Sequence, residues 1–229
     1  MLPDDHDLTT RLFLNALREH VDVRGVVHVG AHRGQEVAHY QRAGISQIVL
    51  IEPNPSNYAY LEAEFGKNSD ITVLPYAITD FDGHVEMNVN HSRTGNDESS
   101  SILRLKRLAE IVPTVQTVET VRVASRRLDT LYDSSALRGC NFLNIDIQGA
   151  ELQALRGARA FLRDVDAILI ETNLIEMYEG CALEPQIEDE LNSLGFDCVE
   201  RVYHELYDAA GRFPAWGECL YVRAREPVN

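Results

Sequence analysis

Hydrophobic residues recur along this chain as short continuous runs, rich in β-branched residues, which alternate with longer stretches of mixed apolar and polar residues. Five runs stand out: 26–29, 48–51, 71–74, 142–145 and 167–170. Continuous apolar runs of this length are typical of strands buried on both faces, as in a parallel sheet. Four stretches between or after them have helical length: 35–43, 56–65, 150–162 and 185–194. This alternation predicts an α/β fold with a doubly wound, mostly parallel sheet.

Both ends of the chain depart from that alternation. Five apolar residues predict the buried face of an N-terminal helix within residues 1–22: Leu8, Leu12, Phe13, Ala16 and Leu17. At the other end, 196–203 and 218–223 resemble strands, joined by a loop that holds Asp208, Gly211 and Pro214. We expect these two strands to form an antiparallel hairpin at the sheet edge.

Residues 83–127 interrupt the rhythm between the third and fourth core strands. The order predicted here is a strand at 84–89, a polar loop at 90–101, a helix around 102–112 and a strand at 118–124. We expect this inserted region to hang over the substrate side of the sheet.

Length and composition indicate an ordinary globular protein. The chain has 229 residues and 45% hydrophobic residues, which predicts a single domain over 1–229. No stretch reaches 18 consecutive apolar residues, so no membrane span is predicted. The acidic N-terminus lacks an apolar signal region and the four cysteines show no zinc-like spacing, which favours a cytoplasmic protein with reduced thiols.

The net charge of −15 disfavours broad contact with nucleic acid. One segment opposes that balance: between 102 and 127 there are six basic residues against two acidic ones. The basic residues of this island are Arg104, Lys106, Arg107, Arg122, Arg126 and Arg127. We hypothesise that the island binds a phosphate or carboxylate of an acceptor molecule. A solvated face, or a contact in a homodimer, remains the alternative.

The first core strand ends in a glycine-bearing turn, Gly30-Ala31-His32-Arg33-Gly34, which precedes a helix. Such a turn lets a ligand approach the backbone and exposes helix N–H groups. His32 stands where dinucleotide-binding proteins have the second glycine of G-x-G-x-x-G, so a pyrophosphate-bridged cofactor such as NAD is disfavoured. A tight turn without a ligand is the alternative.

The second core strand ends in Glu52-Pro53-Asn54, and Glu52 lies 22 residues after Gly30. An acidic residue at this distance typically accepts both hydroxyls of a ribose. Pro53 stiffens the turn and Asn54 is suited to cap the next helix. Glu52 acting only as a cap is the alternative.

Three further residues fall at the carboxyl ends of the core strands, where open α/β sheets bind ligands: Ala77, Asp146 and Glu171. Asp146, Glu171 and His32 are therefore our candidates for a general base. Asp146, Glu171 and Asn173 also form a set of oxygen donors that would suit Mg²⁺, but our preferred prediction includes no metal. Glu151 is interpreted as a first-turn acid of a helix.

Together these motifs resemble the FkbM-type methyltransferases, which are class I enzymes that use S-adenosylmethionine. The resemblance spans positions 24–173 and rests on V-H-V-G-A-H-R-G, I-E-P-N-P, F-L-N-I-D-I-Q-G-A-E-L and I-L-I-E. It implies a seven-stranded Rossmann-like sheet and O-methylation of a hydroxyl on a sugar or natural product. It implies a cofactor pocket that includes Gly30, Ala31, His32, Gly34, Glu52, Pro53, Asn54, Ala77, Asp146 and Gln148.

The chain departs from that family pattern at Asn144, where a lysine is common, and at Gln148, where an acid is common. For the acceptor we expect contacts with Ser100, Ser101 and Arg104 of the inserted region. Three alternatives stay open: a non-catalytic nucleotide-binding or scaffold module, an NAD-linked oxidoreductase and an RNA methyltransferase.

Overall fold

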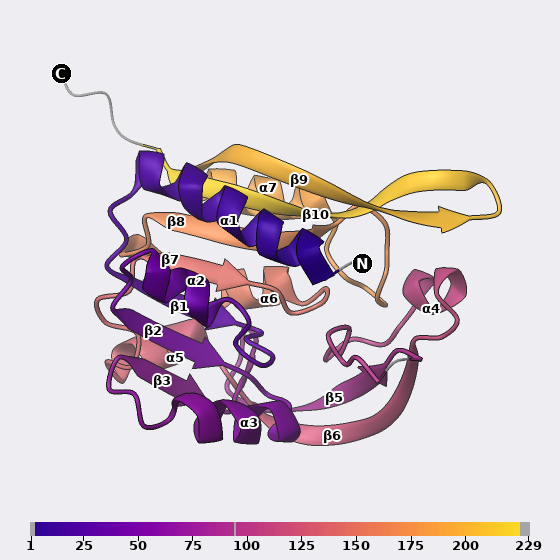
Figure 1. The fold of residues 1–229 in the computed structure, drawn as a ribbon, viewed down its shortest axis with the longest axis horizontal. Helices are drawn as coiled ribbons and strands as arrows, with labels where there is room; N and C mark the ends of the chain where they lie inside the picture. The colour runs from indigo at the N-terminus through magenta and orange to yellow at the C-terminus, as the bar shows by residue number, and fades with distance from the viewer. Residues whose placement is uncertain (1–2, 94, 225–229) are drawn as a thin grey trace.

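The computed structural model describes residues 3–93 and 95–224, with the side chains of 3–11 outside the description. Seven strands form one twisted sheet in the order β3-β2-β1-β7-β8-β10-β9 (Figure 1). The strands are β1 Gly25–Val29, β2 Gln47–Ile51, β3 Ile71–Leu74, β7 Phe142–Ile145, β8 Ala167–Asn173, β9 Phe196–Asp208 and β10 Gly211–Arg223. All neighbouring pairs are parallel except those that β10 makes with β8 and β9. The predicted seven-stranded, mostly parallel sheet is confirmed.

Helices cover both faces of this sheet, as a doubly wound fold requires (Figure 1). The helices α1 Pro3–His20, α2 Val37–Arg42 and α3 Pro55–Phe65 contribute to one hydrophobic cluster. The helices α5 Leu128–Asp133, α6 Glu151–Arg156 and α7 Glu184–Ser193 contribute to the cluster on the opposite face.

Two helical predictions need adjustment. The helix predicted over 150–162 is the short α6 followed by a 3₁₀ turn at Phe161–Arg163, and α2 is shorter than 35–43. On α1, Phe13 and Leu17 are buried as expected, but Leu12 is 44% exposed and Leu14 takes its place in the core. The side chain of Leu8 lies outside the described residues.

The C-terminal hairpin is much longer than predicted. The loop expected between 203 and 218 is strand almost throughout, and only 209–210 lie between β9 and β10. Pro214 fits because a shift in the strand register occurs between Pro214 and Trp216. Turn-forming residues at 208, 211 and 214 disguised this extension in the sequence.

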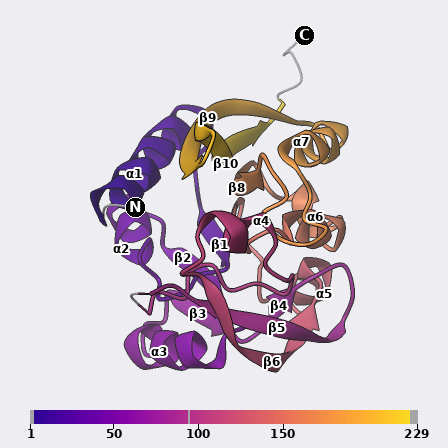
Figure 2. The ribbon, with the colours of Figure 1, turned by 90° about the vertical axis from the view of Figure 1, so that its right-hand side faces the viewer.

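The inserted region forms a second, three-stranded sheet in the order β4-β6-β5 (Figure 2). Its strands are β4 Ala77–Ile78, β5 Gly83–His91 and β6 Gln116–Arg126, and the predicted helix is only α4 Arg107–Ile111. β4 follows β3 in the chain, just before the inserted residues. Its pairing with β6 joins this segment to the inserted region. In Figure 2 this small sheet and α4 lie in front of the carboxyl ends of the core strands.

The cysteines at 140, 181, 198 and 219 are free thiols. No helix in the described part of the chain is long and apolar enough to cross a membrane.

Candidate functional site

A cleft lies between the carboxyl ends of the core strands and the inserted sheet. Concave sites lined by apolar side chains and a few polar groups are typical of small-molecule and cofactor binding. Nine predicted site residues line it: Gly30, His32, Glu52, Pro53, Ala77, Ser100, Ser101, Asp146 and Gln148. The structure adds lining residues that the sequence did not indicate, among them Asn57, Met87, Asp97, Ile102 and Ile147.

The turn after β1 requires glycine at position 30. Gly30 has a φ of +86°, and a Cβ atom there would lie 1.8 Å from the carbonyl oxygen of Asp146. The backbone N–H of Gly30 donates to the carbonyl of Ile51. The turn therefore presses the end of β1 against the loop after β7, and brings Gly30 and Asp146 to the same edge as predicted.

Glu52 is held between two turns of the backbone. Its Oε2 accepts from the N–H of His32 at 2.9 Å and its Oε1 accepts from the N–H of Asn54 at 2.8 Å. Burial raises the pKa of Glu52 to about 7, and the two backbone hydrogen bonds oppose that rise. Each carboxylate oxygen keeps a second lone pair, so Glu52 can still accept from the hydroxyls of a ligand in the cleft.

Asp97, from the inserted loop, lies at the same end of the cleft as Glu52 and His32. Its carboxylate accepts from His32 Nε2 at 2.7 Å, Asn57 Nδ2 at 2.9 Å and Asn54 Nδ2 at 3.3 Å. Burial alone would raise the pKa of Asp97, but the hydrogen bonds from His32 and Asn57 outweigh it and lower the pKa. Asp97 thus ties the insertion to the turns after β1 and β2.

His32 is engaged at both ring nitrogens. Besides the Nε2 contact with Asp97, its Nδ1 lies 2.9 Å from Gln35 Nε2. The donor at Gln35 implies that Nδ1 accepts and that Nε2 carries the proton toward Asp97. This arrangement fixes the turn, where His32 adopts a φ of +47°.

Five other predicted residues do not line the cleft: Ala31, Gly34, Asn54, Arg104 and Glu171. Ala31 is fully buried, and a Cβ atom on Gly34 would lie 2.8 Å from Phe65, so both residues serve packing beside the turn. Asn54 caps α3 by accepting from the N–H of Ser56. Arg104 is exposed and its side chain is not among the cleft residues.

Asp146 and Glu171 meet at the other end of the site. The amide Nε2 of Gln148 donates to Asp146 Oδ1 at 2.7 Å and to Glu171 Oε1 at 2.9 Å. Glu171 does not itself line the cleft, but it contacts Gln148, which does. Burial, followed by the charges of the neighbouring carboxylates, raises the pKa of Glu171 well above its ordinary value.

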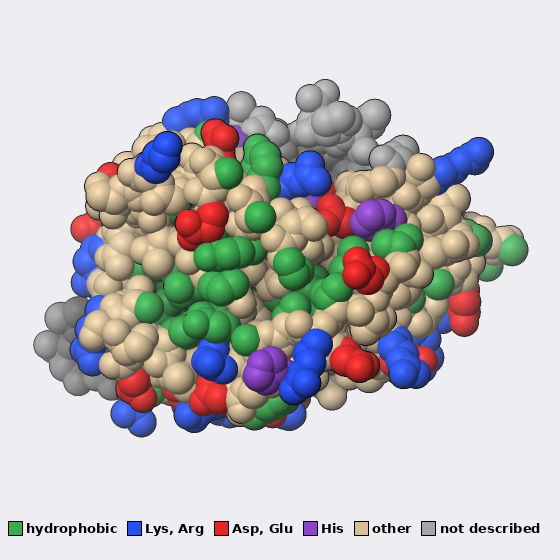
Figure 3. Space-filling model, turned by 90° about the horizontal axis from the view of Figure 1, so that it is seen from below, with side chains coloured by type: hydrophobic (Ala, Val, Ile, Leu, Met, Phe, Trp, Pro, Cys, Tyr) green, Lys and Arg blue, Asp and Glu red, His purple; other side chains and the backbone are tan. Residues whose placement is uncertain are grey.

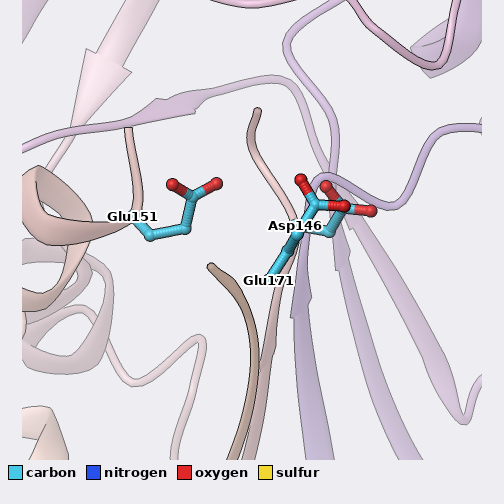
Figure 4. A group of neighbouring side chains, drawn as sticks. All are labelled: Asp146, Glu151 and Glu171. Carbon is cyan, nitrogen blue, oxygen red and sulfur yellow. The ribbon is translucent and has the colours of Figure 1, made fainter. Parts of the chain in front are cut away.

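Glu151 is the third carboxylate of this end. Carboxylate oxygens of Asp146, Glu151 and Glu171 lie within 4.8 Å of one another, and Figure 4 shows all three side chains directed into one space. Glu151 Oε1 accepts from the N–H groups of Ile147 and Gly149, and burial raises the pKa of Glu151 to about 7.

Two of the six basic residues of the island pair with acids outside it, and Arg107 pairs with Glu110 inside it. Lys106 pairs with Glu176 at 2.5 Å, and Arg127 pairs with Asp82 at 3.3 Å. Arg126 lies over the ring of Tyr76. No Lys or Arg of the described residues lines the cleft. The surface seen from the side of β3 and β6 carries basic and acidic side chains interspersed (Figure 3). These contacts give no support to an anion site.

Comparison with known proteins points in one direction. A family model described as the methyltransferase FkbM domain matches residues 28–198. The 2-O-methyltransferase NoeI of Sinorhizobium fredii (strain NBRC 101917 / NGR234) is 25% identical over 162 residues. That match covers 68% of this chain and 65% of NoeI, which is just under two thirds of the relative.

Solved structures with the same fold include two methyltransferases. The N-methyltransferase NodS from Bradyrhizobium japonicum WM9 aligns with a TM-score of 0.55 and 9% identity, over 98% of this chain and 99% of NodS. The precorrin-6y C5,15-methyltransferase from Geobacter metallireducens GS-15 aligns with a TM-score of 0.50 and 10% identity, over 94% of this chain and 88% of that one. At these identities the likeness concerns the fold.

Proposed function

This chain belongs to the FkbM methyltransferase family, and from that premise we propose that it transfers the methyl group of S-adenosylmethionine to a hydroxyl of a sugar or natural-product acceptor. The observation that carries the proposal is the position of Glu52. Its buried carboxylate lines the cleft beside the Gly30 turn and retains acceptor capacity for a vicinal diol.

The residues present suit an adenosyl group. Glu52 would accept from the ribose hydroxyls, and Pro53, Ala77, Ile78 and Met87 provide apolar surface for a base. The absence of a side chain at Gly30 lets the turn pack directly against the carbonyl of Asp146 at the edge of the cleft. When bound, the sulfonium of this cofactor supplies an activated methyl group, and the protein contributes alignment and exclusion of water.

For the acceptor, we propose Asp146 as the general base. Asp146 lines the cleft at the end of β7 and is held by Gln148. An alcohol becomes a better nucleophile as its proton is removed, so a carboxylate within reach of the hydroxyl accelerates transfer. His32, with both ring nitrogens engaged, positions the turn instead, and Glu171 acts on Asp146 from the neighbouring strand.

The match with the 2-O-methyltransferase NoeI supports a hydroxyl acceptor. Ser100 and Ser101 line the cleft, and we propose that they contact the acceptor. Arg104 is exposed and does not line the cleft, so we do not include it among these contacts. We also propose that the protein acts in the cytoplasm as a single domain.

The test is methyl transfer from radiolabelled S-adenosylmethionine to four acceptor sets: neutral glycosides and polyols, sugar phosphates, primary amines and total RNA. We expect label in the neutral hydroxyl set. Label confined to RNA or to amines, or no label despite cofactor binding, would contradict the proposed acceptor class.

A further inference from the structure

The amide of Gln148 lies between two carboxylates that would otherwise repel each other. One NH₂ group donates to Asp146 at 2.7 Å and to Glu171 at 2.9 Å. Like charges this close disfavour ionisation of both groups, and hydrogen bonds to the charged forms oppose that effect, although the pKa of Glu171 stays well above its ordinary value. The charge that Asp146 and Glu171 carry therefore depends on which way this amide faces.

Tyr178 determines which way the amide faces. Its hydroxyl donates to Gln148 Oε1 at 2.5 Å, and its ring is buried between the α4 segment and the chain after β8. Burial raises the pKa of Tyr178 well above its ordinary value, so the hydroxyl keeps its proton. Because only the amide oxygen can accept that proton, the NH₂ group must face the carboxylates.

The backbone of Gln148 is fixed as well. Ser101 Oγ donates to its carbonyl oxygen at 2.8 Å, and Gln148 adopts a φ of +56°. Tyr178 also donates to the carbonyl of Ser99 at 3.2 Å. The inserted loop thus holds Gln148 from the backbone while Tyr178 holds it from the side chain.

We propose that Tyr178, acting through Gln148, is a positioning residue that keeps Asp146 ionised and directed toward the acceptor hydroxyl. This inference rests on the proposed function for its catalytic meaning. The hydrogen bonds that carry it do not depend on that function.

We call the hydrogen bonds from Tyr178 through Gln148 to Asp146 and Glu171 the relay. The acidic groups around Glu171 increase its importance. The other groups that act on Glu171 are Glu151 from α6 and Glu218 from β10, both acidic. His204 of β9 lies 3.7 Å from Glu218, and Cys181 lies beside Tyr178 in the loop after β8. None of these groups is a Lys or an Arg, so the two N–H donors of Gln148 favour the charged forms of the carboxylates against acidic surroundings.

The experiment is the pH dependence of kcat/KM for the wild type and for Tyr178→Phe, with Tyr221→Phe as the matched control. Tyr221 is fully buried, and its hydroxyl faces Arg201 and not Gln148. In Tyr178→Phe the amide is free to turn its oxygen toward the carboxylates. We expect the acidic limb of the plot of kcat/KM against pH to move up by about one pH unit in this variant. On that limb kcat/KM should fall by about tenfold, and it should recover at higher pH. Tyr221→Phe should keep the wild-type profile.

A loss of rate by the same factor at every pH, with the acidic limb unmoved, would mean that Tyr178 serves only packing and would overturn the inference. A second variant, Gln148→Leu, removes the bridging donor at nearly constant volume and covers the case in which Tyr178→Phe does not fold. It should move the limb in the same direction and further.

A measurement without substrate separates this inference from the proposed function. The titration of Glu171, followed by carboxyl ¹³C NMR and assigned with Glu171→Gln, should shift to higher pH in both Tyr178→Phe and Gln148→Leu. If no acceptor is methylated but this shift occurs, the proposed function fails and the relay stands. If methylation occurs but the titration of Glu171 is unchanged in both variants, the relay fails alone.

Discussion

The two ends of the cleft differ in the hydrogen-bond partners of their carboxylates. At the Gly30 end, Glu52 and Asp97 together accept five hydrogen bonds from backbone and side-chain N–H groups. At the opposite end, Asp146 and Glu171 share the amide of one glutamine and face further acids.

This difference separates binding from chemistry. Carboxylates that accept several hydrogen bonds hold a fixed geometry, and Glu52 keeps a lone pair on each oxygen for a diol with known positions. At the crowded end, burial and neighbouring acids raise the pKa of Glu171, so the charges of the carboxylates there influence one another, which suits proton transfer. The variants below test whether the two ends can be damaged independently.

Asp146→Asn should produce the largest effect, a loss in kcat of about 10²–10⁴, because an amide cannot take up the acceptor's proton. Binding of S-adenosylhomocysteine should change far less. Rapid-quench methyl transfer gives the rate and calorimetry gives the affinity. The exposed Asp133→Asn is the matched control. Equal losses in rate and in cofactor affinity would place Asp146 at the binding end.

Gly30→Ala should destabilise the fold by about 3 kcal/mol or more, since the new methyl group meets the backbone of Asp146. Denaturant unfolding measures the loss. Gly44→Ala is the control, because Gly44 shares a positive φ but a Cβ atom there meets nothing within 4 Å. It should cost only about 1 kcal/mol of backbone strain. Similar losses for both variants would show that the contact with Asp146 is not tight.

Glu151→Gln should change the pH dependence of stability. Burial raises the pKa of Glu151 to about 7 from an ordinary value of 4.5, so the folded state binds this proton more tightly than the unfolded state. Stability from this group is therefore present below about pH 4.5 and lost as the pH rises toward about 7. The variant, which keeps the oxygen that accepts from Ile147 and Gly149, should gain on the order of 2 kcal/mol over the wild type between pH 5 and pH 8. A constant difference across that range would contradict the shift.

Asp97→Asn should have the smallest effect, a loss of about tenfold in affinity for S-adenosylhomocysteine, since an amide forfeits the charge that His32 and Asn57 face. The rate at saturating cofactor should stay near the wild-type value. Asp82→Asn is the control, because Asp82 immediately precedes the inserted region and is paired with Arg127. An affinity unchanged in Asp97→Asn would remove Asp97 from the binding end.

The sheet and the position of the Gly30 and Glu52 turns were predictable because apolar runs report strands buried on both faces. The extended hairpin was not, because β9 alternates half-buried with exposed residues and β10 contains a proline, a pattern shared with loops. Burial by the rest of the fold decides such segments, and local sequence does not record it.

Within the site, the sequence located residues that follow core strands, together with Ser100 and Ser101 of the insertion, and missed Asp97 and Tyr178. Asp97 reaches His32 across 65 positions, and Tyr178 reaches Gln148 across 30. No spacing rule relates such pairs, since a connecting loop of any length can deliver them. The contacts of Gln148 were also hidden, because nothing in the sequence indicated that its amide joins two carboxylates.

The most direct test of the account is a calorimetric titration with S-adenosylhomocysteine of the wild type, Glu52→Ala and Glu62→Ala, the last an acid on the exposed part of α3. We predict binding to the wild type and to Glu62→Ala with similar affinity, and a loss of about 100-fold in Glu52→Ala, from two hydrogen bonds to a charged group. Undiminished binding by folded Glu52→Ala would contradict the claim that this carboxylate holds the ribose.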